Sequence, residues 1–206
     1  MEPEPARSTT RRVAEELVER GARAVVLVGS YARGDAVPES DLDLLVVGPQ
    51  AFSWRLERRD NFLVSVSALP FEQHREAFAL PDKVCSVVPG WRGALVLYDA
   101  NGLAASLIEE ARVWTWGPIE RRCDERVAEE VTGYAEEEHK LVAALHSGDW
   151  PLAAVQRSLL AVHLAPILAV HRPYPLQLRE PRVGSRGRRH GGGVERDASR
   201  RAGSGW

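Results

Sequence analysis

Two carboxylates at the start of an apolar strand constrain this sequence more than any other feature. Asp41 and Asp43 stand two residues apart, and the apolar residues 44–47 follow them. Because successive side chains of a strand alternate between its faces, both carboxylates share one face, and Leu42 and Leu44 point to the core side. Two like charges held side by side repel, and a cation between them relieves the repulsion. Oxygen-only ligands suit Mg²⁺, or alternatively Mn²⁺.

A second motif precedes this pair. The apolar residues 24–28 predict a short buried strand, which ends at Gly29-Ser30. A strand that ends in Gly-Ser before a helical turn exposes backbone N–H groups where phosphates bind, and glycine lets them approach closely. The Ser30 hydroxyl can donate to a phosphate, and Arg33 adds a positive charge. Each motif alone is usually a turn or a solvated strand edge, so their ordered combination is the specific signal.

The hydrophobic pattern predicts an α/β arrangement followed by helices only. We expect a helix at 8–20 capped by Ser8, Thr9 or Thr10, and a turn or helix cap at 99–102. From residue 119 the pattern is helical, with a break at Gly148, a cap at Asp149 and an apolar last helix to about residue 170. The other expected elements are strands at 24–28, 41–47, 62–69 and 94–98 and helices at 70–80 and 103–113.

These elements predict a mixed-sheet α/β core at 1–115, a small helical domain at 116–175 and a basic Gly/Arg-rich tail at 176–206. The last 28 residues hold eight Arg and seven Gly, which is typical of a disordered segment. Without them the chain has 19 basic and 26 acidic residues, so the expected folded part is acidic. GC-rich DNA translated out of frame would give a similar tail, and this alternative stays open.

Composition also limits the expected location and partners of the protein. The N-terminus is charged and has no signal-peptide pattern, and we expect no stretch to span a bilayer. Cys85 and Cys123 lack metal-ligand spacing and predict reduced thiols. We therefore expect a cytoplasmic protein with no membrane and no nucleic-acid partner. The apolar helix at 152–170 needs a neighbour, which a homodimer could supply.

The segment 28–46 resembles the signature of the polymerase-β nucleotidyltransferase superfamily: Gly-Ser, then Arg-Gly, then Ser-Asp-x-Asp before apolar residues. Residues 20–175 are similar to the aminoglycoside (kanamycin-type) nucleotidyltransferases. The resemblance implies that Asp41 and Asp43 are catalytic and hold two Mg²⁺ ions, and that Gly29, Ser30 and Arg33 bind an NTP. It also implies transfer of an NMP to a hydroxyl of a small, aminoglycoside-like molecule, with release of pyrophosphate.

The sequence departs from this family at two places. The family usually has a third carboxylate on the next strand, where this chain has Ser65, and Asp60 or Glu72 could replace it only in another register. The family's helical glutamate, which acts as the general base, aligns with Gly133, although three glutamates lie nearby: Glu129, Glu130 and Glu136. These departures favour one alternative, a nucleotide-binding pseudoenzyme. Two others stay open: the long helices favour an antitoxin-like minimal nucleotidyltransferase that acts on a protein partner, and the tail is compatible with a truncated gene product.

Overall fold

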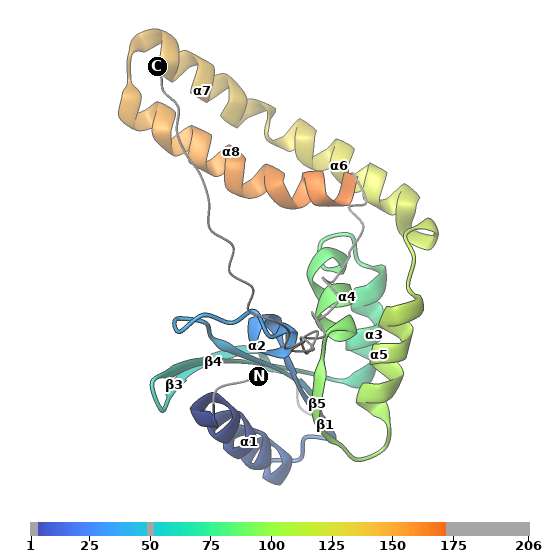
Figure 1. The fold of residues 1–206 in the computed structure, drawn as a ribbon. Coiled ribbons are helices and arrows are strands. Elements are labelled where there is room, and N and C mark those ends of the chain that lie inside the picture. Colours follow the sequence, from blue (N-terminus) through green and yellow to red (C-terminus); the bar gives the residue numbers. More distant parts are fainter. Residues whose placement is uncertain (1–3, 49–51, 172–206) are drawn as a thin grey trace, which may run out of the picture.

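The structure, a computed structural model, describes residues 4–48 and 52–171 (Figure 1). It is an α/β fold, with a mixed five-stranded sheet, flanking helices and a helical region after them, as the sequence predicted. In chain order the elements are α1 (Glu4–Glu19), β1 (Ala24–Val28), α2 (Gly29–Arg33), β2 (Leu42–Val47), β3 (Phe52–Arg59), β4 (Phe62–Leu69), α3 (Phe71–Glu76), the 3₁₀ turn η1 (Ala77–Ala79), α4 (Val84–Arg92), β5 (Leu95–Asp99), α5 (Leu103–Val113), the 3₁₀ turn η2 (Gly117–Ile119), α6 (Glu120–Gly133), α7 (Ala135–Ser147) and α8 (Trp150–His171).

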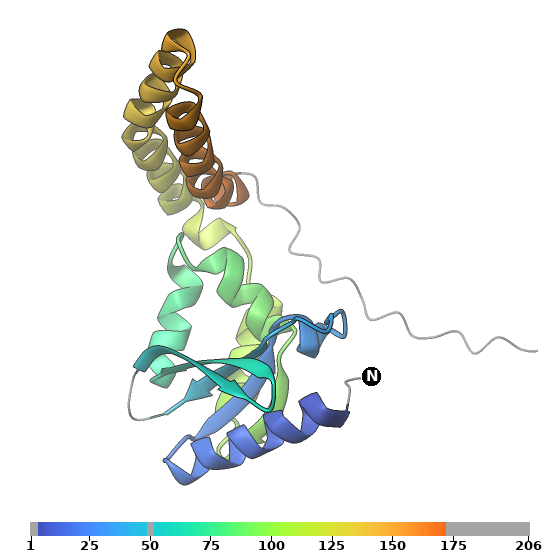
Figure 2. The same cartoon turned by 90° about the vertical axis from the view of Figure 1, so that its left-hand side faces the viewer.

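The strand order is β3-β4-β2-β1-β5. Strands β2 and β4 run parallel, and the other neighbours are antiparallel. Figures 1 and 2 show α1 on one face of the sheet and α3, α4 and α5 on the opposite side. The sheet is therefore the middle layer of the core, and β1 and β2 lie near its centre.

Alternation along the central strands decides which side chains reach which layer. Leu42, Leu44, Val64 and Val66 are at most 1% exposed and belong to the cluster with the buried residues of α1. Trp91 is fully buried in the second cluster, between the sheet and the helices on its other face. The prediction that Leu42 and Leu44 point into the core is confirmed, which leaves Asp41 and Asp43 on the other face of β2.

Several sequence-based boundaries were wrong. Helix α1 begins at Glu4 and not at residue 8, so Thr9 and Thr10 are buried within the helix and do not cap it. The helical stretch expected from residue 119 to 147 is divided at Tyr134 into α6 and α7. Strand β3 and helix α4 were not predicted, because β3 carries many charged residues and α4 contains Pro89 and Gly90.

The turn before α5 is a helix cap. The Asp99 carboxylate accepts hydrogen bonds from the backbone N–H groups of Leu103 (2.8 Å) and Ala105 (3.0 Å). These N–H groups lie in the first turn of the helix and have no partner within it. Asp149 caps α8 in the same way, through the N–H group of Leu152 at 3.1 Å.

Replacing Asp99 with alanine is expected to lower the free energy of unfolding by about 1 kcal/mol, because the two N–H groups lose their acceptor. For a chain of this length the loss corresponds to a decrease in Tm of roughly 2–4 °C. Urea denaturation measures the change, and Asn101→Ala in the same exposed turn is the control. Equal stability of the two variants would contradict the capping role.

The helical region projects away from the sheet, with α7 and α6 lying along α8 (Figure 1). Helix α8 leaves apolar side chains exposed, including Val155 (54%), Val162 (69%) and Leu168 (61%). A homodimer through residues 152–170, which stays a prediction, would cover this surface.

Helix α8 also corrects the expectation about membrane spans. Residues 150–170 are long and apolar enough to cross a bilayer by length and composition alone. The core helix of a soluble protein can pass the same test, so the finding does not decide between the two. The predicted tail lies outside the described residues.

Candidate active site

The two carboxylates lie where β2 begins. Asp43 is the second residue of β2, and Asp41 immediately precedes the strand. Both are half-buried, whereas Leu42 between them is fully buried. In the sheet, Asp43 is paired with Val28 of β1 on one side and with Ser65 of β4 on the other. The structure therefore brings the end of β1, the start of β2 and the middle of β4 to one place.

Gly29 follows β1 directly and lies against Asp43. Its φ of +75° is in the left-handed region, which glycine adopts at little steric cost. A Cβ atom at this position would lie 2.5 Å from Oδ2 of Asp43 and 3.4 Å from its Cγ. The glycine of the Gly-Ser motif is thus required for a reason that the sequence did not show: it makes room for the carboxylate.

Ser30 and Arg33 belong to α2, a single short turn of five residues that ends at Gly34. Arg33 is exposed and forms an ion pair with Asp35, at 3.2 Å between Nη2 and Oδ1. Its charge nevertheless acts on Asp43, since it lowers the pKa of that carboxyl. After α2 the loop is closed by a hydrogen bond from the N–H group of Val37 to Oγ of Ser40, at 2.9 Å.

Ser65 connects Asp43 to the edge of the sheet. Its hydroxyl group is hydrogen-bonded to the Asp43 carboxylate. It also accepts a hydrogen bond from Nε1 of Trp54, at 3.0 Å. Trp54 is on β3, at an irregularity in the pairing with β4 between residues 52 and 55, and is 59% exposed. Sequence reasoning missed Trp54 because it missed β3.

The electrostatics of the pair favour a bound cation. Burial raises the pKa of the Asp43 carboxyl above its ordinary value of 3.8, and the charge of Asp41 raises it further. The hydrogen bond from Ser65 and the charge of Arg33 act in the opposite direction. Without a bound cation, the ionised form of Asp43 is therefore electrostatically disfavoured. A cation beside Asp41 and Asp43 would stabilise it.

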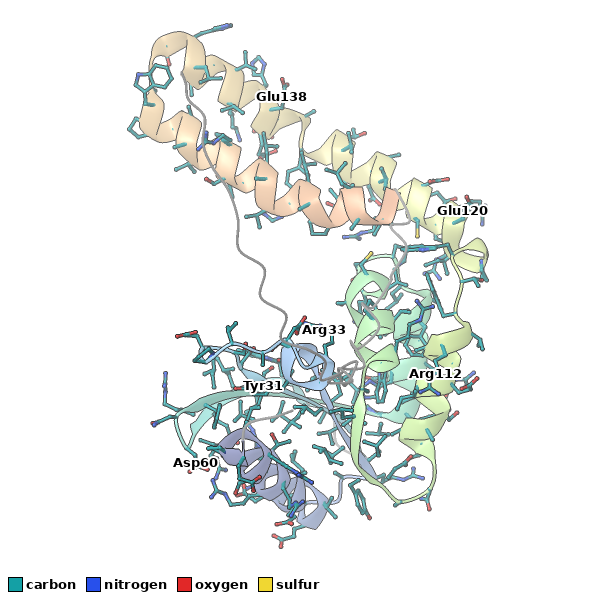
Figure 3. All side chains as sticks on the ribbon, viewed as in Figure 1. Tyr31, Arg33, Asp60, Arg112, Glu120 and Glu138 are labelled. Atoms are coloured by element: carbon teal, nitrogen blue, oxygen red, sulfur yellow. The ribbon has the colours of Figure 1, made fainter. Side chains whose placement is uncertain are left out.

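The other acidic candidates are engaged elsewhere. Asp60 lies in the turn after β3, where it accepts a hydrogen bond from Thr9 (2.9 Å) and is paired with Arg12 of α1. Figure 3 shows Asp60 beside α1, well away from Arg33 on α2. Glu72 forms an ion pair with Arg75 within α3, at 3.3 Å. Neither residue takes the place of a third carboxylate beside Asp43.

The glutamates of the helical region are also paired or exposed. Glu130 forms an ion pair with Arg126 at 2.7 Å, and Glu136 forms one with Lys140 at 2.7 Å. Glu129 is exposed. Of these three, Glu130 lines a pocket of about 390 Å³ between residues 81–85 of the core and helices α6 and α8. Neither Asp41 nor Asp43 is among the described residues that line this pocket.

The residues present fit one divalent cation better than two. Asp41 and Asp43 supply oxygen ligands of the kind that Mg²⁺ prefers. Among the described residues, no group of three or more His, Cys, Asp or Glu is placed to hold a metal ion. The backbone and Arg33 beside Gly29 can meet the charge of a phosphate chain. This arrangement is suited to holding a metal–triphosphate complex at the end of β1.

A comparison with protein families agrees with this arrangement. Residues 10–87 match the family model of the nucleotidyltransferase domain. The nucleotidyltransferase domain match runs from α1 into α4 and includes Gly29, Ser30, Arg33, Asp41 and Asp43. The predicted resemblance is thus confirmed at the level of a nucleotidyltransferase domain, and the kanamycin-type subtype stays a prediction.

Two further comparisons concern the whole chain. A nucleotidyltransferase-like protein from Exiguobacterium sibiricum is a solved structure that is similar over 81% of this chain, with 13% identity and a TM-score of 0.46. This chain covers 58% of that protein's length. A search of curated proteins finds no match.

Proposed function

We propose that this protein transfers an NMP from an NTP to a hydroxyl group of a small molecule, in a reaction that depends on Mg²⁺. The observation that carries the proposal is the contact of Gly29 with Asp43, which joins the end of β1 to the carboxylate pair within the nucleotidyltransferase domain. A Gly-Ser turn and an Asp-x-Asp pair have no reason to be adjacent in a solvated loop. They are adjacent here, at a separation that leaves no room for a Cβ atom at position 29.

The chain's own residues would bind and orient the substrates. The backbone at Gly29-Ser30 and the Ser30 hydroxyl would hold the phosphate chain, and Arg33 would offset part of its charge. Asp41 and Asp43 would hold Mg²⁺ beside this phosphate chain. When bound, Mg²⁺ supplies charge neutralisation at the phosphates and lowers the pKa of a coordinated hydroxyl.

The proposed acceptor is a cationic, aminoglycoside-like molecule. The part of the chain before the basic tail has a net charge of −7, from 19 basic and 26 acidic residues. Negative charge raises the local concentration of a cationic substrate. This argument supports the class of acceptor and does not select one compound within it.

The experiment is Mg²⁺-dependent pyrophosphate release with each NTP against a panel of aminoglycosides and lincosamides. Release is expected only when an acceptor is present, because the acceptor hydroxyl is the nucleophile. The Asp43→Asn variant should show none. Release that is equal in the wild type and in Asp43→Asn would reject the assignment of the site.

One observation favours a second function, nucleotide binding without turnover. Ser65, a neutral residue, stands beside Asp43 where the family resemblance led us to expect a carboxylate. This second function predicts that Mg-NTP binds to the wild type and not to Asp43→Asn, while pyrophosphate release stays at background with every acceptor. Calorimetric titration with a non-hydrolysable NTP analogue separates the two proposals.

A further inference from the structure

The hydroxyl group of Ser65 interacts with a residue on each of the two neighbouring strands, Asp43 on β2 and Trp54 on β3. A serine hydroxyl has one proton to donate and two lone pairs to accept with. The proton goes to the Asp43 carboxylate, and one lone pair accepts the indole N–H of Trp54 at 3.0 Å. Ser65 therefore offers Asp43 a hydrogen-bond donor on the side where a second cation would have to bind.

The register of the sheet makes this position decisive. Strands β2 and β4 run parallel, and Ser65 is the direct neighbour of Asp43 across them. The next residue of β4 on the same face is Ser67, which is opposite Leu45 and not opposite a carboxylate. A third acidic ligand on β4 that reached the pair would thus have to stand at residue 65.

The protein supplies few ligands for two ions. Two Mg²⁺ ions in one site lie ~3.5–4 Å apart and repel each other, so carboxylates that bridge them are needed. Asp41 and Asp43 supply two negative charges, and the described residues place no third metal-ligating side chain with them. The triphosphate of a bound nucleotide supplies further oxygen ligands for one ion.

We infer that the site holds one divalent cation, together with the triphosphate, and that Ser65, positioned by Trp54, occupies the place of the ligand for a second one. The inference deepens the proposed function and rests on it only for the nucleotide. It replaces the two ions that the family resemblance implies.

The test counts bound Mn²⁺ by electron paramagnetic resonance, first with the protein alone and then with a saturating non-hydrolysable ATP analogue. The wild type should bind one ion per chain in both titrations, and Asp43→Asn should lose the ion in the protein-only titration. The Ser65→Asp variant should bind two ions with the analogue, because it adds a carboxylate beside Asp43. Ser67→Asp is the matched control, since it adds the same charge to the same face opposite Leu45, and it should stay at one.

Each outcome decides the inference. Two ions, or none, in the wild type overturn it, and so does a folded Ser65→Asp variant that stays at one ion. One ion in the protein-only titration with no nucleotide binding would support the single-cation site, and it would overturn both the triphosphate part of the inference and the proposed function.

Trp54 provides a second readout that does not depend on the folding of Ser65→Asp. Paramagnetic Mn²⁺ at the carboxylates should quench Trp54 fluorescence, because the indole is hydrogen-bonded to the Ser65 hydroxyl group, which is itself hydrogen-bonded to Asp43. The quenching should saturate at one ion per chain and be lost in Trp54→Phe. Quenching that is unchanged in Trp54→Phe would place the ion elsewhere.

Discussion

Replacing Asp43 with asparagine is expected to reduce nucleotidyl transfer by at least about 100-fold, because it removes the charge that the proposed function assigns to holding Mg²⁺. Asparagine has nearly the same shape and keeps the space that Gly29 provides. The change therefore tests the charge of the side chain and not its packing. Pyrophosphate release measures the loss.

The same substitution is expected to stabilise the metal-free protein. Ionised Asp43 is partly removed from water and lies beside Asp41, and asparagine removes both costs. Because the carboxyl is only half-buried, solvent screening limits the gain to on the order of 1 kcal/mol or less. Without metal, thermal unfolding of Asp43→Asn should thus show a Tm slightly above that of the wild type. When Mg²⁺ and nucleotide are added, a larger, ligand-induced increase in Tm is expected in the wild type only.

The pH dependence has a definite sign. The pKa of Asp43 is raised in the folded state, so the native protein binds more protons than the unfolded chain from pH 3.8 up to the folded-state pKa. The contribution of Asp43 to stability decreases as pH rises through that window. The advantage of Asp43→Asn should therefore be absent below the window and complete above it.

Asp35→Asn is the matched control for this prediction. Asp35 lies in the exposed loop between α2 and β2, and its replacement removes the same charge from the chain. Asp35 is paired with Arg33 and is not among the atoms that a Cβ at Gly29 would meet. It should leave both Mg²⁺ binding and the pH profile close to those of the wild type. A stability gain as large in Asp35→Asn as in Asp43→Asn would show that overall charge, and not the carboxylate pair, is the cause.

Replacing Gly29 with alanine is expected to abolish metal–nucleotide binding and to destabilise the fold. The left-handed φ of +75° costs about 1–2 kcal/mol for any residue with a Cβ atom. In addition, the new Cβ would lie 2.5 Å from Oδ2 of Asp43, so the carboxylate must move. Displacement of Asp43 breaks its alignment with Ser65 and with the phosphate-binding turn.

Gly34→Ala separates these two effects. Gly34 has nearly the same φ, +77°, but a Cβ there meets nothing within 4 Å. Both variants should lose stability in chemical denaturation, whereas only Gly29→Ala should lose Mn²⁺ and nucleotide binding. Equal binding losses in the two variants would mean that backbone strain in α2, and not contact with Asp43, explains the requirement for glycine.

Local sequence patterns predicted the central strands and the position of the carboxylates. The period of two across residues 41–47 placed Leu42 and Leu44 in the core, and their burial confirms it. The apolar run at 24–28 and the turn at 99–102 were also predicted correctly. These signals are local, because strand alternation and helix capping depend on residues near one another in the chain.

Tertiary structure decided what surrounds those residues. The contact of Gly29 with Asp43, the hydrogen bond from Trp54 to Ser65 and the pairing of Asp60 with α1 join segments that no local pattern relates. Strand β3 was missed because charged residues mask its period, and it forms only because β4 supplies a partner for its backbone. The sequence therefore predicted where the two carboxylates are. The packing of the sheet decided which neutral groups stand beside them, since neighbours across strands are set by register and not by sequence distance.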